Sequence, residues 1–145
     1  MKKAWIYLDT STYLKLYVKE KGYDKTRRLL KKGTMLSSAI LPLECFSALS
    51  RKKHSGELDA SNFDELVKRI KKDLQFVEII CLSNEILTKA ESIVLNSTVR
   101  SLDAMHIASA LVFEELSGVT LDFITSDIRQ AEVAKHCGLR TQLVR

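Results

Sequence analysis

The sequence predicts an α/β fold, in which a mostly parallel central sheet of about five strands is flanked by about seven helices. Short segments rich in β-branched residues alternate along the chain with segments whose apolar residues recur at helical spacing, a pattern typical of parallel sheets. The chain has 145 residues, the size of one ordinary domain. Because no repeat, low-complexity tract or linker divides it, we expect a single domain over residues 1–145.

The first half of the chain predicts two strands and four helices. Leu14, Tyr17 and Val18 share one face of the first helix. The fourth helix is the clearest, because its apolar residues recur at helical spacing with lysine and arginine on the opposite side. The strands are expected at Trp5–Leu8 and Thr34–Ser37, and the helices at about Thr12–Lys19, Tyr23–Lys32, Ile40–Lys53 (ending near Gly56) and Phe63–Leu74.

The second half predicts three strands and three helices. Ser83 is placed to cap a helix with one apolar side. Gly138 is placed to end the last helix, because glycine accepts the left-handed conformation that follows many helices. The strands are expected at Phe76–Leu82, Leu121–Ser126 and Leu139–Val144, and the helices from Ser83 through Val94, at Leu102–Phe113 and at Asp127–Cys137.

Composition excludes several classes of protein. Apolar residues make up 46% and charged residues 28% of the chain, the balance of a soluble globular protein, and no apolar run reaches the length of a membrane span. The apolar patch near the N-terminus stops at Asp9 and is too short for an export signal, which predicts a cytoplasmic location. Three widely spaced cysteines without a CxxC pair predict reduced, mostly buried thiols.

The formal net charge is +5, and the basic residues are clustered. Clusters lie at Lys25–Lys32, Ser50–His54 and Lys68–Asp73. Each cluster alone is typical of a solvated helix face. Together with the excess positive charge, they permit a phosphate-rich partner.

Four acidic residues are expected at one edge of the sheet. Asp9 and Asp127 follow the first and fourth predicted strands, and ligands of open parallel sheets bind at the carboxyl ends of the strands. Asp103 lies at the start of the apolar helix Leu102–Phe113, and Glu44 lies within a helix among apolar neighbours. Such a group of carboxylates would repel unless a cation lay among them, and its hard oxygen ligands suit Mg²⁺ or Mn²⁺.

A structural interpretation exists for most of these acids. Asp103 and Asp127 would each favour a helix N-terminus through the helix dipole, and Asp9 could be a turn residue. Glu44 is harder to explain in this way, because an unpaired charge on an apolar helix face is costly. Asp9 as a phospho-accepting aspartate is disfavoured, since Ser11 stands where the corresponding phosphatases have a second aspartate.

Four segments of the chain, in order and at the usual spacing, resemble the signatures of PIN-domain ribonucleases, and most closely the VapC toxins of toxin–antitoxin pairs. They read "YLDTSTYLKLYVKE", "SSAILPLECFSAL", "RSLDAMHIASAL" and "FITSDIRQAEVAKHCGL". The resemblance implies a PIN-like domain. Its implied catalytic and metal-binding acids are Asp9, Glu44, Asp103 and Asp127, and its implied metal is Mg²⁺ or Mn²⁺.

The resemblance also implies roles for hydroxyl residues, and the chain departs from the family pattern at two positions. Thr10, Ser11 and Ser126 match positions that shape the metal and phosphate site. Pro42 is expected to kink or delay the helix that carries Glu44, and Gln130 stands where the family often has an apolar residue. Neither departure removes an acid.

The implied activity is metal-dependent hydrolysis of RNA phosphodiester bonds. Arg100, just before the helix that carries Asp103, is a candidate phosphate contact, and His106 is either a metal neighbour or a hydrogen-bonded core histidine. The resemblance further implies a homodimer and a small antitoxin as partner. Two alternatives stay open: a PIN-like module that binds RNA or protein without cleavage, and a housekeeping RNA-processing nuclease without a toxin role.

Overall fold

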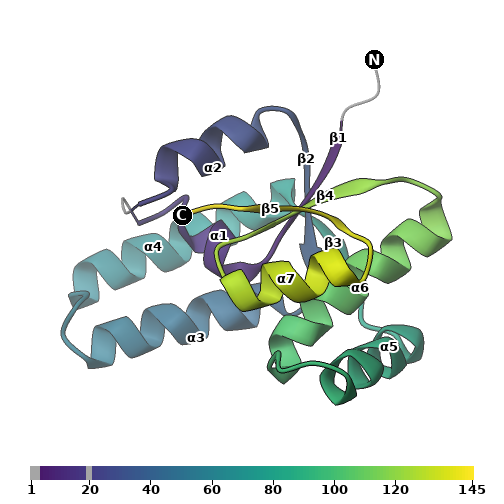
Figure 1. Ribbon diagram of the computed structural model, residues 1–145. Helices are drawn as coiled ribbons and strands as arrows, with labels where there is room; N and C mark the ends of the chain where they lie inside the picture. Colours follow the sequence, from purple (N-terminus) through teal and green to yellow (C-terminus); the bar gives the residue numbers. More distant parts are fainter. Residues whose placement is uncertain (1–3, 19–20) are drawn as a thin grey trace.

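A computed structural model of the protein describes residues 4–18 and 21–145, and Figure 1 shows helices on both sides of a central sheet. The strands are β1 (Ala4–Leu8), β2 (Gly33–Ser38), β3 (Glu78–Ile80), β4 (Leu121–Thr125) and β5 (Arg140–Leu143). The helices are α1 (Thr10–Leu14), α2 (Tyr23–Leu30), α3 (Leu41–His54), α4 (Ala60–Asp73), the 3-10 helix η1 (Leu74–Phe76), α5 (Asn84–Leu95), α6 (Ser101–Ser117) and α7 (Ile128–His136).

The five strands of the described ranges form one fully parallel sheet in the order β3-β2-β1-β4-β5. β1, the first strand in the sequence, is therefore the central strand. Its neighbours β2 and β4 run in the same direction, so the carboxyl ends of all three lie at one edge of the sheet. The predicted α/β fold is confirmed, with five strands and seven α-helices in the part of the chain that the structure describes.

Successive residues of β1 point to opposite faces of the sheet and pack into two separate cores. Tyr7 belongs to the core under α5, α6 and α7, whereas Ile6 and Leu8 belong to the core under α1, α2, α3 and α4. All three residues are almost completely buried, as expected for the central strand of a parallel sheet covered on both faces.

The predicted first helix, Thr12–Lys19, is wrong in its bounds. α1 begins at Thr10 and ends at Leu14, because Asp9 caps it by accepting a hydrogen bond from the backbone N–H of Thr12 at 3.1 Å. Turns follow it, and Lys19 lies outside the described residues. The cap places Asp9 at the junction of β1 and α1.

The strand predicted at Phe76–Leu82 is shorter than expected. β3 covers only Glu78–Ile80, at the edge of the sheet, where it pairs with β2 alone. Phe76 and Leu82, the two ends of the predicted strand, are exposed and lie outside β3. Of the three free cysteines, Cys45 alone is buried, which corrects the expectation of mostly buried thiols.

The helices that carry the predicted site form as the sequence indicates. α6 is buried over most of its length, in keeping with its apolar composition. Pro42 neither kinks nor delays α3, because it occupies the first turn, where its missing N–H has no intrahelical partner to lose. Ser83 caps α5 as predicted, by accepting a hydrogen bond from the N–H of Ile86. Within the described ranges, every helix is too short or too polar to cross a membrane.

Candidate active site

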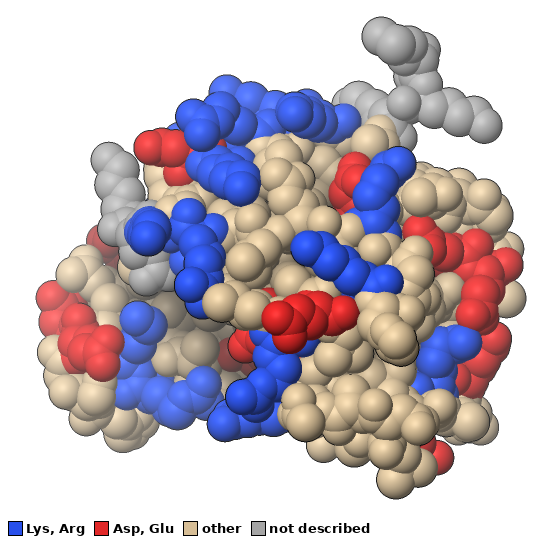
Figure 2. Space-filling model, viewed as in Figure 1, with Lys and Arg blue, Asp and Glu red and all other residues tan. Residues whose placement is uncertain are grey.

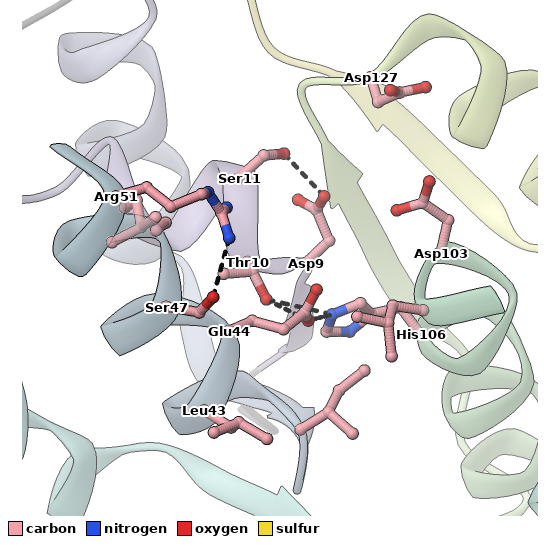
Figure 3. A pocket seen from close by; sticks show the side chains of 14 residues that line it. Asp9, Thr10, Ser11, Leu43, Glu44, Ser47, Arg51, Asp103, His106 and Asp127 are labelled. Carbon is pink, nitrogen blue, oxygen red and sulfur yellow. Dashed lines mark hydrogen bonds and ion pairs between the residues drawn. The ribbon is translucent and has the colours of Figure 1, made fainter. Parts of the chain in front are cut away.

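Asp9 is held in place where β1 passes into α1. Its side chain is buried, and both carboxylate oxygens accept hydrogen bonds. Oδ1 accepts from the backbone N–H of Thr12 at 3.1 Å, and Oδ2 accepts from the Ser11 hydroxyl at 2.7 Å. Figure 3 shows this carboxylate between the α3 side and the α6 side of a cavity. The buried charge is thus oriented by its own helix before any ligand binds.

Glu44 is half-buried on α3, and His106 of α6 contacts its carboxylate. His106 Nε2 lies 2.7 Å from Glu44 Oε1, and the Thr10 hydroxyl donates to the same oxygen at 2.6 Å. The other ring nitrogen of His106, Nδ1, lies 2.7 Å from the hydroxyl of Tyr7 on β1. A buried chain of three side chains, which we call the Tyr7–His106–Glu44 relay, therefore connects the central strand to the carboxylate (Figure 3 shows its His106 and Glu44 end).

The relay sets the protonation of its members. Burial raises the pKa of Tyr7 well above its ordinary value, so its hydroxyl stays protonated. In the His106 tautomer that carries its proton on Nε2, this hydroxyl donates a hydrogen bond to Nδ1. His106 Nε2–H is then free to donate to Glu44. Burial alone would raise the pKa of Glu44, but the hydrogen bonds from His106 and Thr10 outweigh burial and lower that pKa. Glu44 is consequently held as a carboxylate.

Asp103 lies in the first turn of α6 and is the least satisfied acid of the group. Within the described ranges, its carboxylate accepts no hydrogen bond and joins no ion pair. Burial raises its pKa, and the negative charges of Asp127 and Asp9 raise it further. Arg100, not Asp103, occupies the N-cap position of α6 and makes no side-chain cap. Asp103 therefore does not cap α6.

Asp127 caps α7 and is connected to Asp103 through Gln130. Its Oδ1 accepts from the backbone N–H of Gln130 at 2.8 Å. The Gln130 side chain is fully buried, accepts from the Thr125 hydroxyl at 2.6 Å and donates to the Asp103 carbonyl at 3.3 Å. Gln130 thus ties the end of β4 to the first turn of α6, which explains a polar residue where the family often has an apolar one.

One cavity of about 460 Å³ brings most of the predicted residues together. Besides the four acids, Thr10 and Ser11 line it, and so does His106. Its remaining wall includes Leu14, Ile40, Leu43, Ala48, Leu102, Ser47 and Arg51. Figure 3 shows Asp9, Asp103 and Asp127 around this space, with Asp103 at the start of α6.

Two predicted site residues lie elsewhere. Ser126 lines neither this cavity nor the cleft beside it, and its hydroxyl lies 3.1 Å from that of Thr12 in α1. Arg100 lines the adjoining cleft rather than the cavity itself. Sequence reasoning missed Tyr7 and Gln130, because neither has a neighbour in the sequence that would signal its long-range hydrogen bonds.

The four acids fit a divalent cation by their chemistry. All offer hard carboxylate oxygens, which suit Mg²⁺ or Mn²⁺, and over the described ranges no lysine or arginine pairs with any of them. Within these ranges no three acidic, histidine or cysteine side chains lie close enough together to hold a metal ion. Carboxylates without a cation between them repel one another, and their side chains can rotate apart. The backbone therefore decides which acids can reach a shared cation, but it does not fix the distances between their carboxylates.

Comparisons with known proteins show the family of the chain. A family model described as the PIN domain matches residues 6–136. Ribonuclease VapC46 of Mycobacterium tuberculosis is 31% identical over 138 residues, which are 94% of this chain and 95% of that protein.

Solved structures share the fold. VapBC2 from Rickettsia felis, bound to a DNA fragment from its promoter, matches with a TM-score of 0.69 at 15% identity, over 97% of this chain and 99% of that chain. VapBC-1 from nontypeable Haemophilus influenzae matches with a TM-score of 0.65 at 14% identity, over 96% and 97% of the two chains. The family model covers most of the chain and the mycobacterial relative nearly all of it, so the protein belongs to the PIN-domain family, as the four sequence segments predict.

Proposed function

We propose that this protein is an endoribonuclease that hydrolyses RNA phosphodiester bonds with Mg²⁺ or Mn²⁺ held by Asp9, Glu44, Asp103 and Asp127. The observation that carries the proposal is the convergence of these acids, from four separate elements, on one cavity where, within the described ranges, no lysine or arginine pairs with any of them. The name of the mycobacterial relative, a ribonuclease, supports RNA as the substrate.

Different residues of the site would bind the cation, orient the acids and bind the RNA phosphate. Bound by the carboxylates, a divalent cation supplies Lewis acidity and lowers the pKa of a water molecule. Thr10 and Ser11 orient Glu44 and Asp9 through their hydroxyls. Arg100, exposed beside the acids, is placed to bind a phosphate of the RNA. The Ser126 hydroxyl contacts the Thr12 hydroxyl in the first turn of α1, outside the lining of the cavity.

We also propose that the protein is the toxin of a VapBC-type pair and acts as a homodimer. The structural neighbours are VapBC complexes and a toxin–antitoxin complex from Klebsiella pneumoniae, which supports a small antitoxin as partner. The cavity joins carboxylates to exposed apolar residues, among them Leu43 and Leu102. An antitoxin segment with an apolar residue next to an arginine or lysine would satisfy both parts.

The first prediction concerns the acids. The purified protein cleaves RNA in Mg²⁺ or Mn²⁺ and stops in EDTA, and Asp9→Asn, Glu44→Gln and Asp127→Asn each lose most of the cleavage rate. Asp59→Asn is the control. Asp59 caps α4 by accepting a hydrogen bond from the backbone N–H of Asn62 at 2.8 Å, as Asp127 caps α7, but Asp59 does not line the cavity. Cleavage at the wild-type rate in EDTA would exclude the metal mechanism.

The second prediction concerns the Tyr7–His106–Glu44 relay. Tyr7→Phe removes one hydroxyl without changing shape, and we expect kcat to fall about tenfold, as for other groups that orient metal ligands. Tyr13→Phe is the matched control, because Tyr13 is as deeply buried as Tyr7. Its hydroxyl hydrogen-bonds the hydroxyl of Tyr17, which does not line the cavity.

Both substitutions should lower the free energy of unfolding by about 1 kcal/mol. A purely structural role for Tyr7 predicts equal losses of stability with unchanged kcat in both variants. That outcome, measured by urea unfolding and steady-state cleavage of a labelled RNA, would remove the relay from the mechanism.

The third prediction concerns the partner. Expression of the protein alone in a bacterial host arrests growth, and co-expression of the neighbouring small gene product relieves the arrest. Asp9→Asn expressed at the same level is the control and should not arrest growth. Arrest without relief would favour a housekeeping nuclease, and the absence of both arrest and cleavage would favour a binding module.

A further inference from the structure

A second cleft, of about 640 Å³, adjoins the acidic cavity and shares Asp103 and Asp127 with it. Three arginines, Arg100, Arg129 and Arg145, line this cleft together with Glu132. They come from three different parts of the chain: the residue before α6, the first turn of α7 and the end that follows β5. We call it the arginine cleft. Figure 2 shows basic side chains gathered in separate groups on this face, with acidic side chains between them.

The arginines of this cleft have no partner within the described ranges, unlike most others of the protein. Arg51 donates to Ser47, and Arg140 pairs with Asp122. The remaining partnered arginines, Arg27 and Arg69, lie over tyrosine rings. Arg100, Arg129 and Arg145 are exposed and make none of these contacts. Guanidinium groups that the fold does not use are available for a ligand with oxygen acceptors.

The charge of the cleft depends on what its acids hold. Three arginines face three carboxylates there, so the formal charges of the side chains cancel. Asp103 and Asp127 are the acids assigned above to a divalent cation. With these two carboxylates neutralised, the arginines are opposed by Glu132 alone and the cleft becomes positive. A phosphate is then attracted to the side of the cavity on which the arginines lie.

The two sides of the acids differ in chemistry. The acidic cavity has an apolar wall on the α1 and α3 side, where Leu14, Ile40 and Leu43 lie, and the arginine cleft has Ile128 as its one apolar residue. A nucleobase of RNA has an apolar face, whereas the sugar–phosphate backbone of RNA carries a negative charge at each phosphate. A single strand of RNA that lies across the four acids would contact the apolar wall of the acidic cavity on one side and the guanidinium groups of the arginine cleft on the other.

We propose that Arg129 and Arg145, together with Arg100, form a subsite for a backbone phosphate of single-stranded RNA next to the bond that is cut. The inference rests on the proposed ribonuclease function and adds the side from which the strand is held. It assigns a part in substrate binding to Arg129 of α7 and to Arg145 after β5, of which Arg145 lies outside the four segments of the family resemblance.

Binding of RNA, measured apart from cleavage, tests the subsite. The background is Glu44→Gln in Mg²⁺, which keeps three aspartates for the cation. The probe is a short fluorescein-labelled oligouridylate, and its Kd is measured by anisotropy over a series of salt concentrations. The double variant Arg129→Ala/Arg145→Ala should bind about tenfold more weakly at low salt, and the slope of log Kd against log salt should fall by about 0.7, the loss of one phosphate contact.

Two further variants fix the interpretation. Arg28→Ala removes an exposed arginine of α2 that lines neither the cavity nor the cleft, and should leave Kd within about twofold of the background value. Glu132→Gln removes the opposing charge of the cleft and should tighten binding. An equal loss in Arg28→Ala would mean that net charge rather than the cleft decides affinity.

The outcomes separate this inference from the proposed function. If the background protein binds the oligomer and the double variant binds it equally well, the subsite is wrong and the ribonuclease proposal stands. If the background protein does not bind it and the wild type does not cleave RNA, both proposals fail. A weaker Kd with a lower salt slope in the double variant alone supports the subsite.

Discussion

Mutual repulsion of carboxylates is the constraint on which the rest of this structure depends. The parallel order of β2, β1 and β4 brings the ends of three neighbouring strands to one edge, and the chain places acids there and on the two helices beside it. Like charges so arranged destabilise the folded state unless each is oriented or neutralised. The helix starts at Asp9 and Asp127 and the hydrogen bond from His106 to Glu44 meet this requirement for three of the acids.

The fold satisfies the acids unequally. Asp9 and Asp127 begin helices and accept backbone N–H groups, and Glu44 is bound by His106. Asp103 accepts no hydrogen bond within the described ranges, and burial and the charges of its neighbours raise its pKa. Three acids are therefore stabilised by the protein itself, and the fourth depends on what enters the cavity. This uneven arrangement is what distinguishes a binding site from a set of helix caps.

Local patterns in the sequence predict the fold and the acids, and they miss the contacts that bind distant segments. Strand ends and apolar helices indicate where Asp9 and Asp127 lie, and the structure places both on the shared cavity. No local pattern indicates that Tyr7 meets His106 across 99 positions of the chain, or that Gln130 reaches Asp103 across 27. The predicted first helix begins two residues later than α1, because the sequence pattern does not show that Asp9 caps α1. β3 was predicted too long because an edge position cannot be read from composition.

The central claim is that Asp103 serves a cation and not the helix that carries it. Thermal unfolding of the wild type and of Asp103→Asn, each in EDTA and in Mg²⁺, tests this claim most directly. The substitution keeps the shape of the side chain and forfeits only the helix-dipole term of about 0.3 to 1 kcal/mol, which relief of repulsion outweighs. We expect the variant to melt at or above the wild-type temperature in EDTA, and Mg²⁺ to raise the melting temperature of the wild type more than that of the variant. A variant that is clearly less stable than the wild type in EDTA, with equal Mg²⁺ shifts in both proteins, would contradict it.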